Sequence, residues 1–233
     1  MQILAGTSGW QYKEWKGSFY PEKISTEDML AYYASKFRTV EVNNTFYRLP
    51  RESVLRAWAE TVPADFRFVL KASQRITHHA RIGENAVEPL GFLLRVAGSL
   101  GARLGPILFQ LPPNLKKDLP RLQAFLGHLP EGTRASFEFR HSSWFDDDVF
   151  DALRAHDVAL CVASTDEDEA PSVATAGYGY LRLRKEAYEA DELERWADWI
   201  RQQAWSEAYV FFKHEDEGTG PKLARRFLDI VEA

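Results

Sequence analysis

Cysteine is nearly absent from this chain of 233 residues, since Cys161 is the only one. A single cysteine excludes a disulfide within the chain and a metal centre built from several thiolates. Cys161 lies in the apolar run Val158–Ala163, where we expect a small core residue rather than a nucleophile. Long apolar runs are also missing, and none approaches the roughly 20 residues of a membrane-spanning helix.

Excess positive charge is lacking too, because the formal net charge is −5. No global basic field would attract nucleic acid, so any site for an anion must be local. Residues 1–6 have neither the charged region nor the hydrophobic stretch of a secretion signal. Together with the scarcity of cysteine, this predicts a cytoplasmic protein that does not bind a membrane.

What the chain does contain is a regular alternation of short apolar runs and amphipathic segments. Eight runs have the length and composition of strands. They are Ile3–Gly6, Thr39–Phe46, Arg67–Ala72, Pro106–Leu111, Ala135–Arg140, Val158–Ser164, Gly179–Arg184 and Ala208–Lys213.

Helical spacing of apolar residues fills most gaps between these runs. It is clearest around Leu30–Phe37, Leu90–Ala97, Leu193–Ile200 and Leu223–Val231, and weaker at Glu52–Glu60, Leu119–Leu126 and Phe145–Ala155. Ser25 and Asp28 have the spacing of a capping box, and Pro221 suits the first turn of the last helix. The stretch 166–176 is acidic, contains Pro171 and has no apolar face, so we expect a loop or a single turn there.

Eight strands alternating with helices favour an α/β fold, a (β/α)8 TIM-type barrel with a degenerate helix between strands six and seven. A doubly wound sheet is disfavoured, because Gly6–Gly9 is too short for a phosphate-binding fingerprint and no helical pattern follows it. No linker rich in Pro, Gly or Ser divides residues 1–233, so we expect a single domain.

The segment Ser136–Trp144 places opposite charges in an apolar strand. Alternation puts Glu138 and Arg140 on one face, opposite Phe137 and Phe139. Such charges are costly in apolar surroundings unless they pair with each other or bind a ligand. Because the functional residues of these barrels lie at the carboxyl ends of the strands, we interpret this segment as part of a site.

Polar and aromatic side chains gather at the expected carboxyl ends of the other strands as well. We select these candidate binding residues: Trp10, Asn43, Tyr47, Gln110, Arg140, His141, Trp144, Arg182, Arg184 and Lys213. Several cations converging on one barrel mouth predict a site for phosphate, carboxylate or a nucleic-acid backbone. Gly218–Pro221 would add free N–H groups at a helix start, although the acidic residues 215–217 before it would repel an anion.

Three residues are candidates for catalysis. Glu138 and Glu41 are carboxylates on facing strands, an arrangement that suits acid–base chemistry. A structural ion pair between Glu138 and Arg140 is the alternative interpretation. Lys71 would stabilise charge, and its apolar strand neighbours would lower its pKa, which also suits a Schiff base.

No metal site is expected, and the sequence defines no cofactor. Histidine and acidic residues near strand ends lack a metal-binding spacing, and the neighbouring cations disfavour a divalent metal. They are His78, His79, Glu138, His141, Asp166, His214 and Glu215. Aromatic residues in the same loops, such as Trp10, Tyr47 and Trp144, suit stacking on a sugar or a base, or pack beneath the loops.

Six motifs occur in order along the chain. They are Gly6–Trp10 with Tyr12 and Trp15, Phe19–Pro21, Glu41–Pro50, Thr77–His78, Leu108–Pro113 and Phe137–Trp144. Together they resemble the YecE-like proteins, the domain of unknown function 72 family. The resemblance spans essentially the whole chain and implies a TIM-type barrel, but it implies no particular activity.

Two departures from the family pattern concern the expected site. Many members carry Arg-x-His-Gly at strand seven, where this chain has Arg182–Lys185, and many carry paired asparagines after strand eight, where it has Lys213–Pro221. If these elements contact the substrate, the resemblance implies a different ligand in this branch of the family.

These observations predict an enzyme that acts on a phosphorylated or other anionic small molecule by acid–base chemistry, as a hydrolase, lyase or isomerase. Arg140, Arg182 and Lys213 would hold the anion. One alternative is a barrel that processes or binds nucleic acid, and another is a ligand-binding protein without catalysis.

Overall fold

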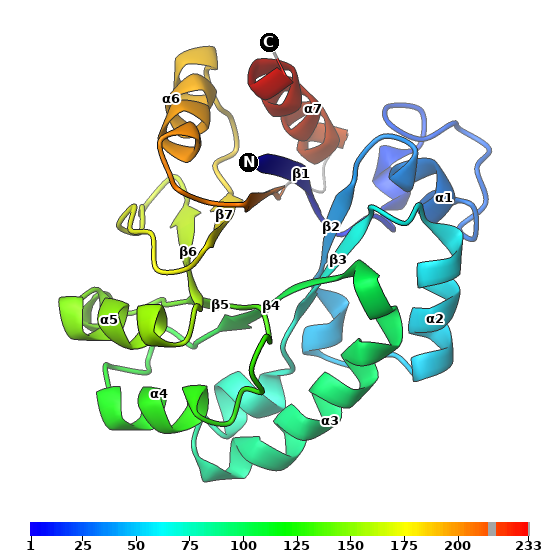
Figure 1. Cartoon of the computed structure of the whole chain (residues 1–233). Helices are drawn as coiled ribbons and strands as arrows, with labels where there is room; N and C mark the ends of the chain where they lie inside the picture. The colour runs from blue at the N-terminus through cyan, green and yellow to red at the C-terminus, as the bar shows by residue number, and fades with distance from the viewer. Residues whose placement is uncertain (214–217, 233) are drawn as a thin grey trace.

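The computed structural model describes residues 1–213 and 218–232. Eight parallel strands form a closed barrel, in which each strand pairs with the next and β8 pairs with β1 (Figure 1). The strands are β1 (Gln2–Ser8), β2 (Thr39–Val42), β3 (Arg67–Lys71), β4 (Leu104–Gln110), β5 (Ala135–Glu138), β6 (Ala159–Ser164), β7 (Tyr178–Leu183) and β8 (Glu207–Phe212). The predicted TIM-type α/β barrel is confirmed.

Helices surround the barrel on the outside (Figure 1). Within the described residues they are α1 (Met29–Ala34), α2 (Glu52–Thr61), α3 (Val87–Ala97), α4 (Leu119–Leu126), α5 (Asp147–Ala155), α6 (Ala190–Arg201) and α7 (Thr219–Glu232). Shorter helical turns occupy Lys13–Trp15, Asn44–Phe46, Arg75–His79, Glu84–Ala86, Gly98–Arg103 and Ser142–Trp144. In this part of the chain, no helix has both the length and the apolar character needed to cross a bilayer.

Between β6 and β7 the chain has no helix, which confirms the prediction for this unit; every residue from 165 to 177 is described. Thr175 anchors the segment instead. Its hydroxyl accepts a hydrogen bond from the Leu160 amide and donates one to the Val158 carbonyl, both at 2.7 Å. These bonds hold the loop against β6 without a helical face.

The second strand is shorter than predicted. It ends at Val42, and Asn44–Phe46 forms a 3-10 turn instead of continuing the strand. The Thr45 hydroxyl lies 2.8 Å from the Val42 carbonyl and 2.7 Å from the Lys71 carbonyl, so it fastens this turn to both β2 and β3. The turn thereby places the Phe46 ring beside Lys71 at the carboxyl end of β3.

An apolar core fills the barrel, as alternation along each strand requires. It includes Leu4, Val69, Leu108, Cys161, Tyr180, Tyr209 and Phe211. Cys161 is buried there, and burial raises the pKa of its thiol, so its expected packing role agrees with its position. The inward-facing positions one step further along several strands carry polar residues, and these form the candidate site.

Candidate functional site

Arg182 on β7 lies at the centre of a buried ion network. Its Nη1 donates to Glu138 Oε2 at 2.6 Å, and its Nη2 donates to Glu41 Oε1 at 2.9 Å. All three side chains are 2% exposed or less. Because β2, β5 and β7 are not adjacent strands, these bonds cross the barrel and tie its carboxyl end together.

Glu41 accepts hydrogen bonds from several further groups. The Tyr180 hydroxyl donates to Oε2 at 2.5 Å, while Ser8 Oγ and Asn43 Nδ2 donate to Oε1 at 2.8 and 3.1 Å. Burial raises the pKa of Glu41, but the charge of Arg182 and the bonds from Tyr180 and Ser8 outweigh burial and lower this pKa overall. Glu41 therefore stays ionised at neutral pH.

Glu138 is held in the same state by two cations. Arg140 Nε lies 2.5 Å from Glu138 Oε1 in an ion pair, although the geometry is not that of a hydrogen bond. Burial raises the pKa of Glu138, but the charges of Arg182 and Arg140 lower it to about 2. The two negative charges of Glu41 and Glu138 thus balance the two positive charges of Arg182 and Arg140. These two carboxylates therefore do not neutralise any further cation at this face.

Lys71 lies half-buried at the carboxyl end of β3, beside this network. Burial and the charge of Arg182 lower the pKa of Lys71 to about 8, against the attraction of Glu41 and Glu138. Its Nζ lies 4.4 Å from the centre of the Phe46 ring. Among the described residues, no carboxylate lies within ion-pair distance of this amine and no hydrogen bond engages it.

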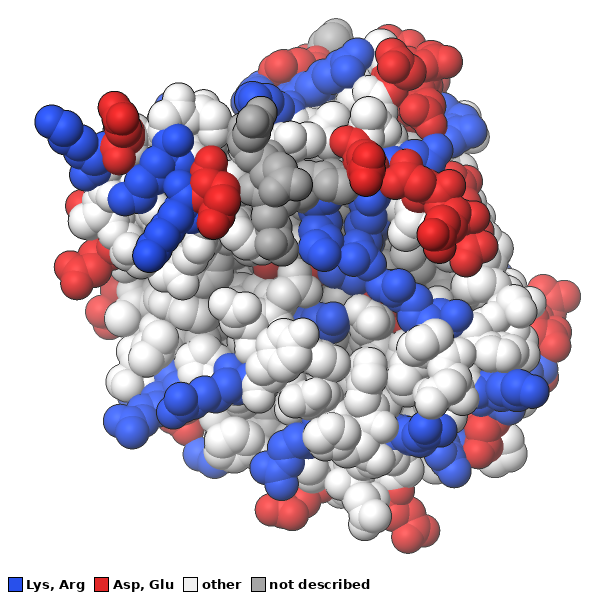
Figure 2. Space-filling model, turned by 180° about the vertical axis from the view of Figure 1, so that it is seen from behind, with Lys and Arg blue, Asp and Glu red and all other residues white. Residues whose placement is uncertain are grey.

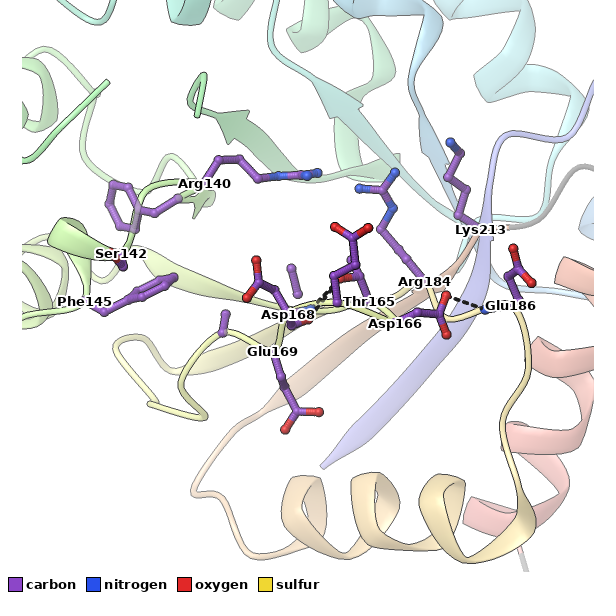
Figure 3. A pocket seen from close by; sticks show the side chains of 14 residues that line it. Arg140, Ser142, Phe145, Thr165, Asp166, Asp168, Glu169, Arg184, Glu186 and Lys213 are labelled. Atoms are coloured by element: carbon purple, nitrogen blue, oxygen red, sulfur yellow. Dashed lines mark hydrogen bonds between the residues drawn. The ribbon is translucent and has the colours of Figure 1, made fainter. Parts of the chain in front are cut away.

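A cavity of about 730 Å³ opens at the carboxyl ends of β5 to β8. Arg140, Arg184 and Lys213 line it. The guanidinium groups of Arg140, just after β5, and Arg184, just after β7, extend toward each other (Figure 3). Figure 2 shows one face of the molecule on which Lys and Arg side chains gather near the middle, with acidic side chains beside them.

Arg184 is the least compensated of these cations. Its Nε is buried and has no hydrogen-bond partner among the described residues. Burial lowers the pKa of Arg184, and the charges of Arg182 and Arg140 lower it further. A bound anion would relieve both effects, because it would supply hydrogen-bond acceptors and opposite charge.

Acidic side chains from the loops after β6 and β7 line the same cavity. They are Asp166, Glu167, Asp168, Glu169 and Glu186. A tight turn builds the first part of this wall, since the Thr165 amide donates to the Asp168 carbonyl at 2.8 Å. Asp166 Oδ2 then accepts a hydrogen bond from the Glu186 amide at 3.2 Å, which joins the two loops (Figure 3).

Trp10 and Trp144, which the sequence placed at the site, belong to the packing beneath it. Trp144 is fully buried, and its Nε1 donates to the Leu115 carbonyl at 2.7 Å. Trp10 is 4% exposed and packs edge-on against Trp58, with 4.9 Å between ring centres. Neither indole offers a face for stacking on a ligand.

Other predicted residues lie around the cavity rather than in its lining. Asn43 is turned toward Glu41, and half-buried Gln110 pairs in register with Glu138 between β4 and β5. His141 Nδ1 accepts a hydrogen bond from the Ser143 amide at 3.2 Å and so caps a 3-10 turn. Tyr47 is 73% exposed.

Sequence reasoning missed several residues that shape the site. Tyr180 lies two positions before Arg182 on the same strand, so alternation turns both side chains toward the barrel interior, and this spacing could have identified Tyr180 from the sequence. Glu167, Asp168 and Glu169 follow shortly after β6, next to Asp166, which the sequence suggested only as a metal ligand, and the carboxyl-end rule applies to all of them. Phe46 was also missed; it contacts His78 edge-on with 4.9 Å between ring centres, a pairing that no spacing in the sequence indicates.

Residues 214–217, which include two of the considered metal ligands, His214 and Glu215, lie outside the described residues. Among the residues that are described, no group of three or more His, Cys, Asp or Glu side chains is arranged to hold a metal ion. The phosphate contact expected at Gly218–Pro221 stays a prediction.

Two curated proteins resemble parts of the chain. The protein YecE of Escherichia coli strain K12 is 36% identical over 114 residues, which cover 48% of this chain and 42% of YecE. The protein YunF of Bacillus subtilis strain 168 is 30% identical over 150 residues, which cover 61% of this chain and 52% of YunF. The matched segments thus span about half the length of these relatives.

Solved structures resemble the whole barrel. A DUF72 family protein from Thermotoga maritima superimposes with a TM-score of 0.86 and 25% identity over 100% of both chains. D-psicose 3-epimerase from Clostridium cellulolyticum H10 with D-tagatose has a TM-score of 0.59 and 11% identity over 100% of this chain and 98% of its own, a likeness of fold alone. The family described as "Protein of unknown function DUF72" matches residues 4–233, so the chain belongs to this family.

Proposed function

We propose that this protein is an enzyme acting on a small phosphorylated or otherwise anionic molecule by acid–base chemistry at the carboxyl-end face of the barrel. The observation that carries this proposal is Arg184, whose Nε is buried without a hydrogen-bond partner among the described residues. A buried guanidinium nitrogen without a hydrogen-bond acceptor lowers the stability of the fold, and an anion that contacts both Arg184 and Arg140 supplies the acceptor and the opposite charge.

The anion is bound by Arg140, Arg184 and Lys213, which line one cavity. Arg182 has a different role from the one expected of it, because its guanidinium is occupied by Glu41 and Glu138. It fixes the two carboxylates, and Glu138 in turn holds Arg140 at the cavity. The buried network therefore positions the binding residues rather than the substrate.

Proton transfer is assigned to Lys71 rather than to the carboxylates. A general acid or base works best when its pKa lies near the working pH. The pKa of Glu138 is about 2, far from neutrality, whereas the pKa of Lys71 is about 8. Lys71 is also accessible, since it is only half-buried at the barrel mouth.

A small molecule is favoured over nucleic acid as the substrate. The acidic residues 166–169 stand beside the cations and would repel a long polyanion. Trp10 and Trp144 are buried, so they offer no surface on which bases could stack. The barrels named as D-psicose 3-epimerases, which share this fold, are consistent with a small substrate.

Thermal unfolding in inorganic phosphate, at constant ionic strength, tests the anion site. Phosphate at one hundred times its dissociation constant stabilises the wild type by about 2.7 kcal/mol if it binds only the folded state. Arg184→Ala and Arg140→Ala lose this response. Arg56→Ala, which removes a cation that is 63% exposed on α2, retains it.

Equal phosphate responses in wild type and Arg184→Ala would contradict the proposal.

Catalysis is tested separately, by measuring turnover in a panel of phosphorylated metabolites with Lys71→Met as the inactive control. Salt-dependent binding of an oligonucleotide more tightly than phosphate would favour the nucleic-acid alternative instead.

A further inference from the structure

Phe46 connects two titratable side chains at the mouth of the barrel. The Lys71 amine lies 4.4 Å from the centre of the Phe46 ring, and the His78 ring contacts the same ring edge-on at 4.9 Å. The 3-10 turn Asn44–Phe46 carries this phenylalanine and is fastened to β3 through Thr45. The three side chains therefore form one cluster, carried by the turn Asn44–Phe46, by β3 and by the helical turn Arg75–His79 that follows β3.

The Lys71 amine lacks the partners that a buried ammonium group ordinarily has. Among the described residues it has neither an ion pair nor a hydrogen bond, although Glu41 and Glu138 lie close enough to influence it electrostatically. Those two carboxylates are turned toward Arg182. The nitrogen lone pair, once the proton has left, is consequently available for another atom.

We infer that Lys71 is a nucleophile that forms a Schiff base with an aldehyde or ketone whose phosphate or carboxylate group is held by Arg140 and Arg184. This inference rests on the proposed function and names its substrate class, an anionic carbonyl compound. Arg140 links the two parts of the site, because it lines the cavity and its charge also acts on Lys71.

The covalent step balances without a co-reactant. The neutral amine of Lys71 adds to the carbonyl carbon, the nitrogen gives up one of its two protons, and the oxygen takes up a proton to give a carbinolamine. The nitrogen then loses its remaining proton while the hydroxyl leaves as water, so that amine and carbonyl give imine and water. Protonation of the imine makes the former carbonyl carbon an electron sink for proton abstraction or carbon–carbon bond cleavage.

The surrounding charges favour this reactivity. Burial, Arg182 and Arg140 lower the pKa of Lys71 to about 8, while Glu41 and Glu138 oppose them. About a tenth of the amine is then neutral at pH 7, compared with well under a thousandth for an ordinary lysine.

While Lys71 is bonded to the substrate it cannot itself transfer protons, and His78, beside the same Phe46 ring, takes over that role. Its Nδ1 lies 2.9 Å from the Thr77 hydroxyl. Burial and the charge of Lys71 lower the pKa of His78, so its ring is mainly neutral at pH 7. A neutral imidazole both accepts and donates a proton, as formation and loss of the carbinolamine require.

Reductive trapping tests the inference. The wild-type protein is incubated at pH 7.5 with dihydroxyacetone phosphate and sodium cyanoborohydride, and the modified lysines are located by peptide mass spectrometry. We expect Lys71 to carry at least tenfold more adduct than exposed Lys116, and inorganic phosphate to suppress the labelling. Lys71→Met should lose the adduct, and Lys116→Met should retain it.

Dihydroxyacetone without phosphate separates this inference from the proposed function. A phosphate-dependent melting shift with no adduct on Lys71 overturns the Schiff base and leaves the anion site intact. Equal labelling of Lys71 by both compounds, without a melting shift, supports the nucleophile and overturns the anion site. Labelling spread evenly over the exposed lysines overturns the inference, whatever the melting curves show.

Discussion

Arg182 Nη2 on β7 lies 2.9 Å from Glu41 Oε1 on β2, although the two strands lie on different sides of the barrel. Backbone ladders join only neighbouring strands, so this contact belongs to the side chains alone. At the carboxyl end of the barrel, distant strands are therefore joined by ion pairs between side chains, whereas the interior below is filled by apolar packing.

Replacing Arg182 by Met should destabilise the protein by about 3–5 kcal/mol, because two buried carboxylates lose their partner. Urea unfolding at pH 7 measures this change. Arg56→Met is the matched control and should alter the free energy of unfolding by less than about 1 kcal/mol, since its ion pair is exposed. A loss below about 1 kcal/mol in Arg182→Met would show that the network is energetically neutral.

Glu138 should give the protein an acid-sensitive contribution to stability. Its folded-state pKa of about 2 lies below the usual 4.5, so the contribution is present above pH 4.5 and is lost as the pH falls toward 2. Glu138→Gln lacks it. The difference in unfolding free energy between the two proteins should therefore shrink between about pH 5 and pH 2.5. A constant difference over that range would mean that Glu138 titrates normally.

Lys71 should lower stability while it is charged, because its folded-state pKa of about 8 lies below the usual 10.5. The folded state binds fewer protons between these values, so wild-type stability should rise with pH in this window. Lys71→Met removes the cost of the buried charge and should be more stable at pH 7 by on the order of 1–3 kcal/mol. This advantage should fade toward pH 10.5, whereas exposed Lys116→Met should show no such trend.

Trp144 should prove to be a packing residue. Trp144→Ala should cost about 3–5 kcal/mol, as expected for a fully buried indole. Trp144→Phe should cost less, mainly through the lost bond to the Leu115 carbonyl. Trp144→Phe should also keep the wild-type melting shift in phosphate, and loss of that shift would return this residue to the ligand-binding set.

The regular parts of this fold could be predicted because strand alternation and carboxyl-end placement are local rules. Alternation alone put Glu138 and Arg140 on one face, and the structure pairs them. The same rules overestimated β2, because Thr45 is β-branched and Phe46 is aromatic, as is typical of strands, yet both lie in a turn. Thr45 decides that outcome through a bond to Lys71, which lies 26 positions away.

The division of roles among the polar residues could not be predicted, because it depends on how the barrel closes. Arg182 was expected to bind an anion from outside, but closure brings Glu41 and Glu138 to both of its terminal nitrogens. Arg184, two positions later, has no such partners among the described residues and lines the cavity instead. Both arginines follow the same alternation, and only their depth in the barrel separates them.

Because the segment between β6 and β7 is a loop without a helix, the side of the cavity that it forms can be replaced by another loop. Its acidic residues 166–169 belong to a turn that is closed by its own hydrogen bonds, and Thr175 fastens the returning chain to β6. A different loop grafted between Ser164 and Thr175 would lose the bridge between Ser164 and Glu169 but would leave the pairing among the eight strands unchanged. The cations of the cavity thus lie at the ends of strands, which the fold holds in place. The acidic residues lie in a loop, and changes in this loop can alter the charge of the cavity without altering the barrel.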